Sequence, residues 1–178
     1  DSFEAHLNQY DVIFLNIQQV LSSAKSPESV ADFLQKSVLN ELKEKYPGQV
    51  KEDDTHLPTV LANIYAQNAE VKKGFVFILD EWDCIFREDK RNTTAQKLYL
   101  DFLKDLFKDR TYVALAYMTG ILPIKKYGTH SALNIFDEYS MTAPEMLAEY
   151  VGFTEKEVAC LCSEYGKDFE EMRLWYDG

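Results

Sequence analysis

A run of five apolar residues that ends in two acids constrains the fold of this chain more than any other feature. Residues 75–79 read Phe-Val-Phe-Ile-Leu, and Asp80 and Glu81 follow directly. A strand that is apolar on both faces is typical of the middle of a parallel sheet that helices cover on each side. The segment therefore predicts an α/β fold whose central strand ends at a pair of carboxylates.

The rest of the core alternates between strand-like and helix-like patterns. Residues 12–17 and 112–118 are short apolar runs rich in strand formers. Apolar residues at helical spacing follow Ser26-Pro27, a favourable helix start, and recur around residues 60–65 and 98–107. Strands separated by helices indicate right-handed crossovers and a mostly parallel sheet. We also expect a short last strand at residues 137–141.

The end of the chain has a helical pattern without strands. Three short helices are expected, at residues 144–151, 155–165 and 168–175. Thr154 and Glu157 form a capping-box pattern at the start of the second of these. We therefore predict two parts: an α/β core at residues 1–142, and a helical extension or the start of a lid domain at residues 143–178.

Charge and cysteine content limit the classes of partner. The formal net charge of −11 disfavours nucleic acids and anionic membranes, because both need clustered lysine and arginine side chains. No apolar run reaches the roughly 18 residues that a membrane-spanning helix needs. The three cysteines, Cys84, Cys160 and Cys162, lack the spacing of a disulfide framework, which favours reduced thiols and a cytoplasmic location.

The acidic pair has the residue types that magnesium-dependent phosphate chemistry requires. A buried strand holds its carboxyl end rigidly at the ligand-binding edge of a parallel sheet. Asp80 can then hold the magnesium of Mg-ATP through water, and Glu81 can orient and deprotonate the attacking water. Thr119 ends the next strand, where a polar side chain can sense the γ-phosphate of ATP. The alternative is that both acids simply end a strand at solvent.

Several neighbouring residues have two interpretations. Trp82 either packs beneath a nucleotide site or belongs to the core, and Asp83 is either a supporting acid or a helix N-cap. Three arginines are candidates for contacts with phosphate or a partner, or are simply solvated: Arg87, Arg91 and Arg110.

Three segments resemble, in order, the motifs of one known family. Residues 74–83, Gly-Phe-Val-Phe-Ile-Leu-Asp-Glu-Trp-Asp, resemble its Walker B segment. Residues 116–124, Ala-Tyr-Met-Thr-Gly-Ile-Leu-Pro-Ile, resemble the strand and turn that follow, and residues 169–178 resemble a helix that ends in Trp-Tyr-Asp-Gly. The family is the bacterial AAA-ATPase-like family of P-loop NTPases, of the ASCE or STAND type. The resemblance implies a partial P-loop NTPase three-layer fold with a helical C-terminal segment.

The resemblance also implies parts that residues 1–178 do not contain. Family members have a Walker A phosphate-binding loop upstream and often a nuclease-like output domain of the PD-(D/E)xK class downstream. No Gly-x4-Gly-Lys-Ser/Thr sequence occurs here, so we expect a fragment that neither binds Mg-ATP tightly nor turns it over alone. The intact protein is expected to use Mg-ATP, with Asp80 as the metal residue and with Glu81 and Thr119 as catalytic residues.

The sheet of this family has the strand order 5-1-4-3-2, and the implied missing strand is central. An open sheet edge is therefore expected, and such an edge invites self-association. The alternative function is a non-catalytic interaction or nucleotide-switch module that regulates a fused output domain.

Overall fold

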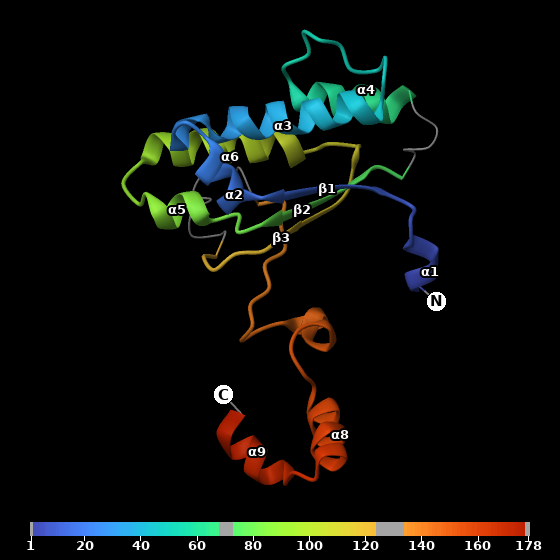
Figure 1. Ribbon diagram of the computed structural model, residues 1–178, viewed down its shortest axis with the longest axis vertical. Helices are drawn as coiled ribbons and strands as arrows, with labels where there is room; N and C mark the ends of the chain where they lie inside the picture. The colour runs from blue at the N-terminus through green and yellow to red at the C-terminus, as the bar shows by residue number, and fades with distance from the viewer. Residues whose placement is uncertain (1, 68–72, 124–133, 177–178) are drawn as a thin grey trace. The chain divides into compact units, whose positions relative to one another are not determined.

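The computed structural model describes residues 2–67, 73–123 and 134–176 of the chain (Figure 1). These residues form two compact units, Asp1–Phe136 and Asp137–Gly178. The division falls a few residues before the boundary predicted after residue 142. Among the described residues, no helix has both the length and the apolar character that crossing a membrane requires.

The first unit is an α/β structure around a three-stranded parallel sheet. Its strands are β1 (Asp11–Asn16), β2 (Phe75–Asp80) and β3 (Val113–Met118), in the order β1-β2-β3. The strand that the sequence predicted to be central is β2, which pairs in parallel with a strand on each side. The predicted α/β class and parallel sheet are therefore confirmed.

Helices make both connections between the strands. The first connection contains α2 (Ile17–Ser23), the 3-10 turn η1 (Pro27–Ser29), α3 (Val30–Lys45) and α4 (Leu57–Gln67). The second contains α5 (Cys84–Glu88) and α6 (Thr93–Phe107), and a short α1 (Ser2–His6) precedes the sheet. The expected start at Ser26-Pro27 is confirmed as a 3-10 turn with a capping box that leads into α3. Helix α2 was not predicted.

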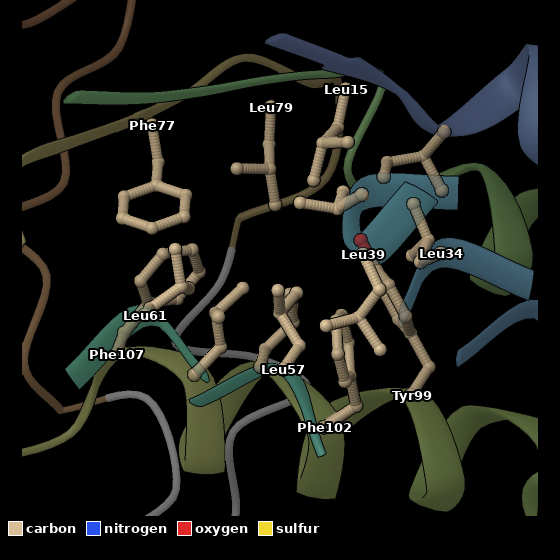
Figure 2. Packing of buried hydrophobic residues seen from close by; sticks show 14 of the residues in the cluster. Leu15, Leu34, Leu39, Leu57, Leu61, Phe77, Leu79, Tyr99, Phe102 and Phe107 are labelled. Atoms are coloured by element: carbon tan, nitrogen blue, oxygen red, sulfur yellow. The ribbon is translucent and has the colours of Figure 1, made fainter. Parts of the chain in front are cut away.

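The hydrophobic core lies between one face of the sheet and the helices α3, α4 and α6 (Figure 1). Figure 2 shows Leu15, Phe77 and Leu79 directed from the strands towards side chains of these helices. Phe77 meets Phe107 of α6 edge to face, with ring centroids 5.2 Å apart. Such aromatic pairs add to the free energy gained by burying the rings, so β2 is held firmly against the helical layer.

The other face of the sheet is exposed. The register of the three strands places six apolar side chains on it: Val12, Phe14, Val76, Ile78, Leu115 and Tyr117. We call this set the uncovered sheet face. The exposed fractions of its outer members are 55% for Val12, 61% for Phe14, 54% for Leu115 and 46% for Tyr117. In the described part of the chain the first unit thus has two layers, and the three-layer arrangement of a P-loop NTPase stays a prediction.

The second unit is helical, as expected. It contains η3 (Glu145–Tyr150), α8 (Glu155–Tyr165) and α9 (Phe169–Tyr176). The capping box of Thr154 and Glu157 forms, and Gly166 ends α8 in the left-handed conformation that glycine adopts easily. The predicted strand at residues 137–141 is wrong, because the segment forms only a single antiparallel bridge between Ser140 and Ala143. That bridge closes a tight turn and adds no strand to the sheet of the first unit.

The two faces of the sheet predict very different costs for removing a phenylalanine. Phe77→Ala should lower the free energy of unfolding by about 3–5 kcal/mol, because it empties a fully buried site against α6. Phe14→Ala, on the neighbouring strand but on the uncovered sheet face, should cost under about 1 kcal/mol. Urea unfolding followed by circular dichroism measures both values. Equal costs for the two variants would contradict the one-sided core.

Candidate functional site

Polar side chains meet at the carboxyl edge of the sheet. Asn16 and Asp80 are paired in register as the last residues of β1 and β2. Thr119 directly follows β3, and its N–H donates to the carbonyl of Leu79 at 2.9 Å. Three neighbouring strands therefore each deliver one polar side chain to the same edge, which is where open α/β sheets bind their ligands.

Asp80 is the centre of this cluster. The Asn16 side-chain N–H donates to Asp80 Oδ2 at 3.2 Å, and the Thr119 hydroxyl donates to Asp80 Oδ1 at 2.6 Å. The Asn16 Oδ1 in turn accepts the N–H of Gln19 at 3.0 Å, so the amide also caps α2. Because this cap fixes which end of the amide faces Asp80, the helix start and the acidic site are built on the same side chain.

Glu81 has an unfavourable backbone conformation and an occupied carboxylate. Its φ of 56° lies in the left-handed region, which residues other than glycine seldom adopt. Its carboxylate forms an ion pair with Arg87 of α5. Backbone strain of this kind gathers at sites where function requires a side chain to be held in one place. Glu81 is thus presented at the strand end, but in this structure its partner is a guanidinium.

Asp83 is a buried acid that holds the loop after β3. Its Oδ2 accepts the backbone N–H groups of Ile121 at 3.2 Å and Leu122 at 2.8 Å. Arg87 Nε lies 3.2 Å from the same oxygen. Asp83 precedes α5, but its side chain makes no capping hydrogen bond to that helix. Asp83 therefore occupies the N-cap position of α5, as one interpretation predicted, while its carboxylate supports the loop after β3.

Most of the other candidate residues either belong to the core or lie at the surface. Trp82 is buried and packs on Phe86, with ring centroids 5.5 Å apart, so it is a core residue. Arg110 pairs with Asp105 of α6, and Arg91 is exposed. Arg87 alone of the three arginines joins the acidic loop. Burial raises the pKa of Cys84, at the start of α5, to about 11, although the charge of Arg87 opposes this, and so its thiol stays protonated.

Sequence reasoning missed Asn16 as a site residue. The available signal was a polar residue at the end of an apolar strand, the same signal that selected Asp80 and Thr119. The partnership of Arg87 with Glu81 had no comparable signal, because an arginine on a short helix has many possible partners.

The residues around Asp80 are compatible with a magnesium ion held through water. In the described ranges, no group of three or more His, Cys, Asp or Glu side chains is arranged to ligate a metal. Each oxygen of Asp80 already accepts one hydrogen bond from the protein, yet a carboxylate has about four acceptor positions. Magnesium retains several of its waters, and those waters can bond to the remaining positions. The residues present therefore fit a water-mediated Mg²⁺.

Comparison of the chain with protein-family models, curated proteins and solved structures gives no match. The functional conclusion therefore rests on the strand-end geometry.

The left-handed conformation of Glu81 leads to a stability prediction with an internal control. Glu81→Gly and Glu81→Ala both remove the ion pair with Arg87, but only glycine relieves the backbone strain. We expect the glycine variant to be more stable than the alanine variant by about 1 kcal/mol. Urea denaturation of the two proteins measures the difference. A more stable alanine variant, the usual order at ordinary positions, would contradict the strained conformation.

Proposed function

We propose that this chain is the acidic, Walker B and sensor half of an ATP-binding and ATP-hydrolysing P-loop ATPase core. The observation that carries the proposal is Asp80, held between Asn16 and Thr119 at the carboxyl edge of the parallel sheet. A rigid carboxylate at this edge, with free acceptor capacity, suits the hydrated magnesium of Mg-ATP.

The sheet supports the same proposal through its strand order. The parallel order β1-β2-β3 equals the 2-3-4 part of the ASCE order 5-1-4-3-2, with β2 as the Walker B strand. In that order the phosphate-loop strand would lie beside β3. We propose that an upstream segment of the same protein supplies this strand and the phosphate-binding loop, and that its helix packs on the uncovered sheet face.

The site residues then have distinct roles. Asp80 holds Mg²⁺ through water, and Thr119 senses the γ-phosphate of ATP from the neighbouring strand. Glu81 orients and deprotonates the attacking water. The carboxylate of Glu81 contacts the Arg87 guanidinium, so this ion pair must open before Glu81 can reach the attacking water. Residues 1–178, which contain no Gly-x4-Gly-Lys-Ser/Thr loop, are expected to be inactive alone.

The proposed role also implies a cellular location and a set of partners. We propose a cytoplasmic location, where ATP is available and cysteines such as Cys84, Cys160 and Cys162, which are free thiols in the structure, stay reduced. The proposed partners are the upstream Walker A segment and a downstream output domain of the same protein, with no direct contact to nucleic acid or membrane.

Calorimetry with Mg-ATP tests the proposal on residues 1–178 and on a longer protein that includes the upstream segment. Only the longer protein should bind, because phosphate binding needs the backbone N–H groups and the lysine of the loop. In that protein, Glu81→Gln should lower turnover by about 10²–10⁴-fold with little effect on binding. Asp80→Asn should weaken Mg²⁺-dependent binding.

Asp105→Asn is the matched control for these variants. It removes an acid of α6 that pairs with Arg110 and His56, and it should leave both binding and turnover unchanged. Turnover that survives Asp80→Asn and Glu81→Gln would overturn the proposal.

A second candidate is a non-catalytic interaction or nucleotide-switch module that regulates a fused output domain. The uncovered sheet face favours it, because apolar side chains gathered on one face mark a site of association. We expect residues 1–178 to associate at high concentration and Phe14→Glu to weaken this association. Sedimentation velocity over a wide concentration range measures both. A sharp monomer at every concentration, with no partner in pull-down, would count against this function.

A further inference from the structure

We infer that Asp83 is a positioning residue that holds the Thr119 hydroxyl on Asp80. The inference rests on the proposed function in one respect: the consequence of this positioning is read at the metal site of Asp80. Three observations carry it, namely the burial of Asp83, the hydrogen bonds that it accepts, and the tight packing of the loop after β3.

Asp83 is the one charged or polar residue that is buried among the described residues, and its side chain is fully inaccessible to solvent. A buried carboxylate lowers stability unless hydrogen bonds and an opposite charge compensate it. The compensation here comes from the loop after β3 and from Arg87, through Oδ2, while Oδ1 is buried without a hydrogen-bond partner. The buried charge is therefore directed at the residues that follow Thr119.

The loop is fixed on both sides of Thr119. The carbonyl of Thr119 accepts the N–H of Trp82 at 3.0 Å, and its own N–H donates to the carbonyl of Leu79. At Gly120 there is no room for a side chain: a Cβ would lie 2.6 Å from Trp82 Cδ1 and 2.7 Å from Asp83 Oδ1. The loop thus lies directly against the Trp82-Asp83 segment. Release of the N–H groups of Ile121 and Leu122 would leave Thr119 held by its own two backbone hydrogen bonds alone, so its hydroxyl would be held less firmly on Asp80.

Arg87 connects this arrangement to Glu81. The same guanidinium contacts the buried Asp83 and the carboxylate of Glu81. The loop after β2 and the loop after β3 are therefore connected. Glu81 and Thr119, the two predicted catalytic residues, are both linked to Asp83 indirectly, Glu81 through Arg87 and Thr119 through the two residues of its loop that Asp83 holds.

Mn²⁺ titration of residues 1–178, followed by electron paramagnetic resonance, tests the inference with Mn²⁺ as a probe for Mg²⁺. The Asp80→Asn variant shows which part of the Mn²⁺ binding signal comes from the Asp80 site. Asp83→Ala and Thr119→Val should each weaken Mn²⁺ binding about tenfold, as changes in the residues that support metal ligands do. The double variant should bind no more weakly than either single variant, because both changes remove the same hydroxyl from Asp80.

Two further variants separate positioning from a loss of fold. Asp83→Asn keeps an oxygen that can accept both N–H groups, so it should restore most of the affinity lost in Asp83→Ala. Gly120→Ala keeps the Asp83 side chain but displaces the loop, because the added methyl group would collide with Trp82 and with the Asp83 carboxylate, and it serves in place of Asp83→Ala should that variant not fold. Asp105→Asn should leave Mn²⁺ binding unchanged.

Hydrogen exchange provides a readout that needs no metal. In Asp83→Ala, the amides of residues 119–122 should exchange about tenfold faster, as local opening allows, while those of α6 keep their wild-type rates. Additive effects of Asp83→Ala and Thr119→Val, or unchanged exchange in this loop, would overturn the inference and leave the proposed function standing. If Asp80→Asn does not weaken Mn²⁺ binding, the proposed metal role fails, and the exchange rates alone decide whether Asp83 positions Thr119.

Discussion

The parallel pairing of β2 with a strand on each side is the constraint on which the rest of the first unit depends. Parallel neighbours cannot be joined by tight turns, so each connection must return the chain across the sheet, and helices do this here. Both connections place their long helices on the same face, where Phe75, Phe77 and Leu79 are buried. The pairing also aligns the carboxyl ends of all three strands, so that Asn16 and Thr119 reach Asp80.

Two features at the acidic edge of the sheet lower the stability of the fold. Glu81 adopts a left-handed backbone, and Asp83 buries a charge with one oxygen unsatisfied. Neither feature improves packing, and both lie within a few residues of the Asp80 carboxylate. Departures from local preference that cluster in this way are expected at sites where position is more important than stability. The guanidinium of Arg87 offsets part of the cost, because it contacts both acids.

The uncovered sheet face and the outer edge of β3 are both surfaces that another segment normally covers or pairs with. Apolar side chains on a parallel sheet are normally buried by a second helical layer, and an unpaired strand edge presents free backbone donors and acceptors. In the described residues, β3 pairs only with β2, while Leu115 and Tyr117 are exposed beside this edge. A strand followed by a helix would satisfy both at once, which is the arrangement proposed for the upstream segment.

Most of the correct predictions came from patterns among residues that are close together in the sequence. The apolar run at residues 75–79, the helical spacing that follows Ser26 and the capping box at Thr154 depend on neighbours along the chain, so the elements there could be recognised. The predicted strand at residues 137–141 is wrong: the segment forms only the bridge between Ser140 and Ala143, and its own sequence does not decide whether it pairs with a distant strand.

The tertiary structure alone decided how the site is assembled. Asn16 and Thr119 bond to Asp80 across 64 and 39 positions of sequence, and Asp83 holds Leu122 across 39. Such partners follow from the register of the strands and the path of the crossovers, which no local pattern contains. The sequence by itself determined an α/β chain with a buried strand that ends in acids. How the distant segments packed decided which side chains meet those acids, and it decided that the described helices cover one face of the sheet.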